Sequence, residues 1–92
     1  MSNPFEINKK SGKKYELLAI RLSEGGLCVP NPALYVDMKL SDDEKEIELY
    51  YTSRAYVIRG SNLFDLAFKI ATKQIGYIEQ DRDSISKIEI IF

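Results

Sequence analysis

One segment of this 92-residue chain, residues 63–74, repeats its apolar side chains every three to four residues, and no other segment does so clearly. That spacing is typical of an amphipathic helix. Asn62 precedes the segment as a natural N-cap, Asp65 suits the positive end of the helix dipole, and Gly76 follows as a residue free to close the helix in the left-handed conformation. The flanking segments alternate apolar and polar residues, as strands do. One late helix among strands predicts an α+β fold.

The alternating segments predict where the strands lie along the chain. Residues 33–40 and 46–51 carry apolar side chains at every second position, so they predict an antiparallel hairpin turned by the polar residues between them. Residues 15–22 are apolar on both faces, which indicates a central strand. Further strands are predicted at residues 27–29, 55–59, 77–80 and 85–92. We expect an antiparallel sheet of five or six strands packed against one helix, in the order β-β-β-β-α-β-β and ending in a hairpin.

Length and composition predict one domain over residues 1–92. Hydrophobic residues make up 45% of the chain and charged residues 29%, which is ordinary for a globular protein. Residues 1–14 hold four lysines against one glutamate and predict a flexible basic arm. The arm lacks the apolar stretch of a secretory signal, and no apolar run is long enough for a membrane span. A lone cysteine, Cys28, fits a small buried side chain in a reducing compartment, so we expect a cytoplasmic protein.

The chain has no histidine, which removes the usual parts of two kinds of chemistry. A histidine-activated nucleophile and a Cys/His zinc site cannot be assembled within one chain. Asp81, Asp83 and Glu79 cluster at one turn, but they lack the glycine and distal glutamate of a calcium loop, so an exposed turn is the better interpretation. We expect no catalytic residue, cofactor or metal. An enzyme using acid or tyrosine chemistry would need a pocket built between subunits.

The apolar arc of the predicted helix is roughly 200° wide, whereas docking on a sheet requires roughly 100°. Phe64, Phe68 and Ile75 lie on one flank of that arc. Either the helix is sunk in the domain, beneath the N-terminal segment or a curled sheet, or its flank is a surface for self-association or for a partner. Ile91 adds an apolar residue to the terminal strand, which predicts an exposed edge unless it is paired on both sides. These four residues form the candidate interface.

The junction between the strand at 55–59 and the helix is a candidate anion site. Arg59, Ser61 and Asn62 lie there, where free backbone amides and the helix dipole favour negative charge. The junction lacks both the glycine-rich dinucleotide motif and the Walker lysine. Ordinary turn and cap chemistry is therefore the alternative interpretation.

The function that these observations favour is a small non-catalytic cytoplasmic module for protein binding or assembly. It would self-associate as a homodimer or dock a larger protein partner. The alternative is a nucleic-acid-associated accessory protein that uses the basic arm together with the strands that carry tyrosine and arginine. The net charge of −1 is unlike that of a typical nucleic-acid binder.

Overall fold

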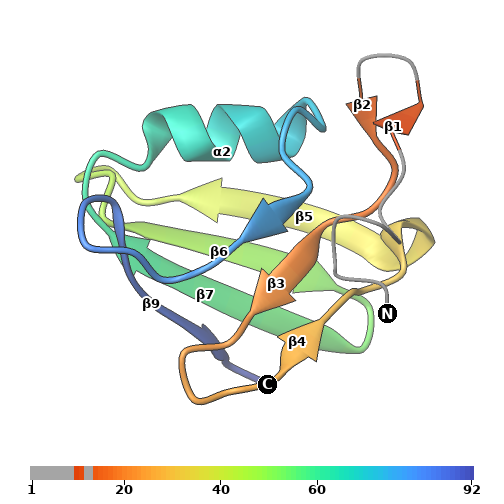
Figure 1. Cartoon of the computed structure of the whole chain (residues 1–92), viewed down its shortest axis with the longest axis horizontal. Helices are drawn as coiled ribbons and strands as arrows, with labels where there is room; N and C mark the ends of the chain where they lie inside the picture. Colours follow the sequence, from red (N-terminus) through yellow and green to blue (C-terminus); the bar gives the residue numbers. More distant parts are fainter. Residues whose placement is uncertain (1–9, 12–13) are drawn as a thin grey trace.

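A four-stranded antiparallel sheet forms the base of the fold. The computed structural model describes residues 10–11 and 14–92 of the chain (Figure 1). Within it, β5 (Tyr35–Leu40) and β6 (Glu46–Tyr51) pair as an antiparallel hairpin, which confirms the hairpin predicted from their alternation. The sheet is completed by β7 (Arg54–Gly60) and β9 (Ile85–Ile90), in the order β5-β6-β7-β9.

A second sheet is built from three short strands that lie far apart in the sequence. Its order is β4-β3-β8, in which β3 (Ala19–Arg21) pairs antiparallel with β4 (Leu27–Cys28) and parallel with β8 (Tyr77–Ile78). A separate antiparallel pair consists of β1 (Lys10–Ser11) and β2 (Lys14–Tyr15). Over the described residues the α+β class is confirmed, with one α-helix late in the chain, whereas the prediction of a single sheet of five or six strands is wrong.

Two departures from the predicted strands produce the two-sheet arrangement, one near the start of the chain and one near its end. The predicted strand at 15–22 breaks after Tyr15, and only three of its residues continue as β3. β3 nevertheless pairs with a strand at each edge, which confirms the predicted central position. The predicted terminal hairpin is wrong because β8 pairs with β3 and β9 pairs with β7. Between them, Asp81 makes a tight turn that carries the chain from one sheet to the other.

Asp81 holds that turn with one oxygen. Its Oδ1 accepts hydrogen bonds from the amides of Ile85, Ser84 and Asp83 at 2.9, 2.6 and 2.9 Å. These bonds hold the pKa of Asp81 below its usual value, the Ile85 amide having the largest effect. A carboxylate that saturates three amides of its own turn has a structural role.

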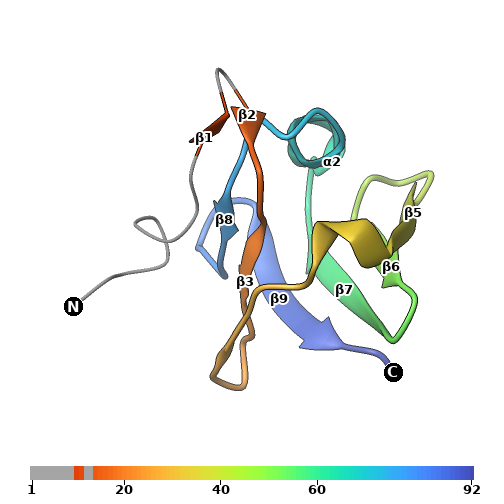
Figure 2. The same cartoon turned by 90° about the vertical axis from the view of Figure 1, so that its right-hand side faces the viewer.

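The hydrophobic core lies between the four-stranded sheet and a layer formed by the helix and the second sheet (Figures 1 and 2). The helix α2 (Phe64–Ala71) and the β3–β8 region cover the same face of the larger sheet. The buried residues that make up this core are Ile20, Ile47, Leu49, Tyr51, Tyr56, Ile58, Leu63, Ala67, Ile78, Ile85 and Ile88.

The helix is shorter than its predicted span of residues 63–74. Leu63 occupies the N-cap position, where no side chain caps the helix, and its amide donates to the Glu44 carbonyl at 2.9 Å. The N-cap predicted at Asn62 is wrong, because Leu63 holds that position and Asn62, one residue earlier, takes a left-handed conformation with φ 54°. At the other end the left-handed residue is Lys73, with φ 59°, and not Gly76.

The predicted basic arm lies largely outside the described residues. The structure describes only the backbone at Lys10–Ser11 and then the chain from Lys14 onward. The flexible arm over residues 1–14 stays a prediction.

Candidate functional site

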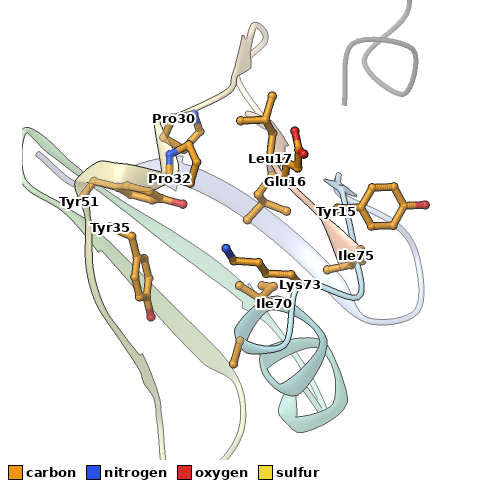
Figure 3. Close-up of a pocket in the computed structure, with 12 residues that line it drawn as sticks. Tyr15, Glu16, Leu17, Pro30, Pro32, Tyr35, Tyr51, Ile70, Lys73 and Ile75 are labelled. Atoms are coloured by element: carbon orange, nitrogen blue, oxygen red, sulfur yellow. The ribbon is translucent and has the colours of Figure 1, made fainter. Parts of the chain in front are cut away.

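A cleft of about 230 Å³ opens beside the C-terminal end of α2 (Figure 3). Its walls come from the chain around β2, from the segment before and within η1 (Pro32–Leu34), and from the residues that follow α2. The lining residues are Tyr15, Glu16, Leu17, Leu18, Pro30, Pro32, Tyr35, Tyr51, Ile70, Ala71, Lys73 and Ile75. Most are apolar or aromatic, and two carry a charge. Such a concave apolar surface with few polar groups is typical of a small-ligand site.

One wall of the cleft is stiffened by its prolines. Pro30 and Pro32 restrict the backbone, and Asn31 between them accepts a hydrogen bond from the Ala33 amide at 2.9 Å through its Oδ1. The Thr52 amide donates to the Leu34 carbonyl at 2.9 Å, which ties η1 to the turn after β6. This wall is therefore positioned without relying on long flexible side chains.

A row of three tyrosines runs from the cleft into the core. The rings of Tyr35 and Tyr51 meet edge to face at 5.7 Å, and those of Tyr51 and Tyr56 at 5.9 Å. Tyr51 is only 9% exposed, and its hydroxyl points into the cleft (Figure 3). Burial raises the pKa of Tyr51 from 10.0 to about 12, so the phenol stays protonated and can donate a hydrogen bond at neutral pH.

This shift predicts a loss of stability at alkaline pH. The folded state holds the Tyr51 proton more tightly than the unfolded state, so the stabilisation is complete below pH 10.0 and is lost as pH rises towards about 12. Tyr51→Phe keeps the ring and removes the ionisation, so its stability should fall less across that window. Urea unfolding of both proteins at a series of pH values measures the difference. If the free energy of unfolding falls equally with pH in both proteins, Tyr51 is not responsible. Burial also raises the pKa of Tyr35 and Tyr56, but both proteins retain these residues, so their effect is common to the two.

Lys73 closes the helix beside the cleft in a way that the sequence did not indicate. The Gln74 amide donates to the Lys69 carbonyl at 2.8 Å and the Lys73 amide to the Ile70 carbonyl at 3.2 Å. This is the Schellman pattern, with Lys73 at the position where glycine is usual. Its ammonium points into the cleft (Figure 3). The sequence feature that could have pointed to this helix end is that no glycine directly follows the predicted helix.

The four candidate interface residues do not share one surface. Phe64 and Phe68 are 60% and 53% exposed on the same flank of α2. Ile75 is half-buried, packs against the core and lines the cleft. Ile91 is exposed just after β9, in the larger sheet. Phe64 and Phe68 are the pair that the structure brings together.

The three candidate anion-site residues also separate. Arg59 forms ion pairs with Glu46 at 3.4 Å and with Glu89 at 3.3 Å. Ser61 lies beside the Asp81 turn, and Asn62 lies beside the flank of α2 that carries Asp65 and Lys69. Neither residue lines the hollow that Arg59 lines. The positive charge of Arg59 is already balanced by two carboxylates, and we build no anion site on it.

The acidic residues and Cys28 are the remaining candidates for metal binding or reactivity. Within residues 10–11 and 14–92 no group of three or more Cys, Asp or Glu side chains is placed to hold a metal ion. Cys28 is half-buried, and its Sγ lies 4.0 Å from an Arg54 nitrogen.

The tyrosines and arginines do not form one stacking platform. Tyr51 and Tyr56 belong to the core, whereas Tyr50 is directed to the opposite face of the sheet, where it donates a hydrogen bond to Glu48. Arg59 and its glutamate partners share that outer face. Carboxylates beside the half-buried Tyr50 ring oppose a phosphate backbone.

With this geometry established, the chain was compared with known proteins. No family model, curated protein or solved structure matches it. In the part of the chain that the structure describes, no helix is long and apolar enough to cross a membrane.

Proposed function

We propose that this protein is a small non-catalytic cytoplasmic assembly module that forms a homodimer through one flank of α2. The observation that carries the proposal is the exposure of Phe64 and Phe68, at 60% and 53%, one helical turn apart. Full burial of a phenylalanine side chain is worth roughly 1.5–3 kcal/mol, and each of these rings is little more than half exposed, so about half of that free energy is left unrealised. An interface that covers both recovers part of it.

The helix directs these two rings away from its own core. Leu63 and Ala67 are buried against the sheet, and Asp65 and Lys69 form an ion pair at 3.1 Å on the flank that faces β8. Phe64 and Phe68 therefore occupy the flank on the side of β5. At the start of β5, the side chains of Tyr35 and Val36 are also exposed.

The edges of the larger sheet are less suited to joining two copies. On β9, the Ile88 amide donates to Ser23 Oγ at 2.8 Å and the Ile88 carbonyl accepts from the Ser23 amide at 2.9 Å. On β5, the Met38 amide donates to Asp37 Oδ1 at 2.8 Å. Occupied groups at both edges disfavour edge-to-edge pairing. Contact through side chains is the better supported route.

A second copy is the partner we propose. A two-fold axis brings the same patch of both chains together, so Phe64 of one copy meets Phe68 of the other without any second type of surface. A stable dimer buries about 800 Å² per partner. The net charge of −1 adds little repulsion between copies.

Charging the flank should separate the copies. We expect Phe68→Glu to reduce the mass measured by light scattering from that of a dimer to that of a monomer, because a buried unpaired carboxylate at the interface is costly. Circular dichroism should be unchanged, since the ring is half exposed in the single chain. Unfolding of this variant would place Phe68 in the core and contradict the proposal.

Ile91→Glu is the matched control. It introduces the same charge at an exposed apolar residue after β9 and should leave the dimer intact. If it separates the copies while Phe68→Glu does not, the interface is at the terminal strand instead. The residues that the structure describes offer no observation in favour of the alternative nucleic-acid function, and we do not propose it.

A further inference from the structure

The cleft beside the C-terminal end of α2 combines apolar walls with one directed positive charge. The Lys73 ammonium points inward, whereas the Glu16 carboxylate at the rim points away from it (Figure 3). Among the described residues Lys73 forms no ion pair. A cation held over an apolar cleft without a protein counter-ion favours an anionic ligand with an apolar body.

The backbone of Lys73 has a strained conformation. Its φ of 59° lies in the left-handed region, which L residues with a Cβ adopt only at a cost. The Schellman turn needs that conformation, and glycine would adopt it without strain. The backbone contacts at this position, including the Tyr15 amide donating to the Lys73 carbonyl at 2.9 Å, require no side chain. The backbone conformation therefore does not call for a lysine, whose positive charge suits the helix C-terminus and whose side chain extends into the cleft (Figure 3).

Tyr51 supplies a second donor. Its hydroxyl points into the cleft (Figure 3), and within the described part of the chain no hydrogen bond to that hydroxyl is recorded. A protonated phenol and an ammonium together match the acceptor oxygens of one carboxylate. Pro30, Pro32 and Leu17 face the remainder of the space with apolar surface.

We infer that this cleft binds a small organic carboxylate whose body is a single ring or a short branched chain. The volume of about 230 Å³ is below the roughly 300–1,000 Å³ of sites for drug-sized ligands, which limits the body to that size. Lys73 and Tyr51 hold the carboxylate, and the proline wall packs against the apolar body. The inference does not depend on self-association, because the Phe64 and Phe68 side chains do not line the cleft.

Phenylacetate, with its neutral amide phenylacetamide as the control ligand, tests this inference. In a titration followed by amide NMR, phenylacetate should shift resonances of residues 15–18, 30–35 and 73 in a saturable way. Phenylacetamide should bind at least tenfold more weakly, since it lacks the charge that Lys73 recognises. Absence of saturable shifts with phenylacetate, or equal binding of the two compounds, would overturn the inference.

Lys73→Gly separates binding from folding. It should weaken phenylacetate binding about tenfold or more while raising the thermal midpoint by about 4 °C, because glycine relieves the left-handed strain. Lys73→Arg should keep the binding and show no such rise. Undiminished binding by the glycine variant would contradict the role of Lys73. Shifts confined to other surfaces would show that the compound binds elsewhere.

Discussion

Gly60→Ala is expected to destabilise the protein by about 3 kcal/mol or more, at or above the upper end of the usual cost of overpacking. A Cβ at position 60 would lie 1.7 Å from the carbonyl oxygen of Ser84, 2.8 Å from its carbonyl carbon and 3.1 Å from Cα of Ile85. All three atoms belong to the backbone, so no side-chain rotation relieves the overlap. The turn after β8 must move instead.

Moving that turn breaks bonds that position both sheets. The Ser61 amide donates to the Ser84 carbonyl at 2.9 Å, and Asp81 binds three amides of the same turn. Urea unfolding followed by circular dichroism measures the loss. Gly26→Ala is the comparison: its Cβ meets nothing within 4 Å, so only the strain of a positive φ remains and the loss should be smaller. A Gly60→Ala protein within about 1 kcal/mol of the parent would show that the turn yields easily.

Ile58→Ala should cost about 2–5 kcal/mol, the range for removing a large aliphatic side chain from a core. Ile58 is fully buried on β7, the strand between β6 and β9, and its registered neighbours are Ile47 and Ile88. These neighbours sit on hydrogen-bonded strands and cannot close the space left behind. A cavity should remain in the centre of the core.

The measurement is again urea unfolding, at one fixed protein concentration because a dimer adds to the apparent stability. Ile91→Ala deletes the same atoms at a position that is 40% exposed and should cost about 1 kcal/mol or less. Equal losses for the two variants would contradict the placement of the core between the two layers. Total stabilities of about 5–15 kcal/mol make the Ile58 loss easy to measure.

Local periodicity predicted the parts of the fold that depend on near neighbours. The hairpin of β5 and β6 follows from alternation, and the helix from its apolar spacing. The predicted strand at 55–59 appears as β7 (Arg54–Gly60). In each case the side chains that determine the element lie within a few residues of one another, so the pattern is visible along the chain.

The second sheet could not be predicted in this way, because its pairing is distant in sequence. Ile20 of β3 pairs with Ile78 of β8, although the helix and most of the larger sheet lie between them in the sequence. A strand of two residues, such as β8, is also too short to show a repeating pattern. The cleft was missed for the same reason, since its walls come from separate segments around residues 15–18, 30–35 and 70–75. The sequence did not single out Lys73 because lysine at a helix end is ordinary, and its left-handed backbone appears only in the structure.

The most direct test of the proposed function is the solution mass of the unmodified protein, measured by light scattering after size exclusion at low and at high salt. We predict twice the mass of the chain under both conditions, because the proposed interface is apolar and salt does not screen it. A monomer at both salt concentrations would contradict self-association through Phe64 and Phe68. A dimer that dissociates at high salt would contradict an apolar interface and point to charged contacts between the copies.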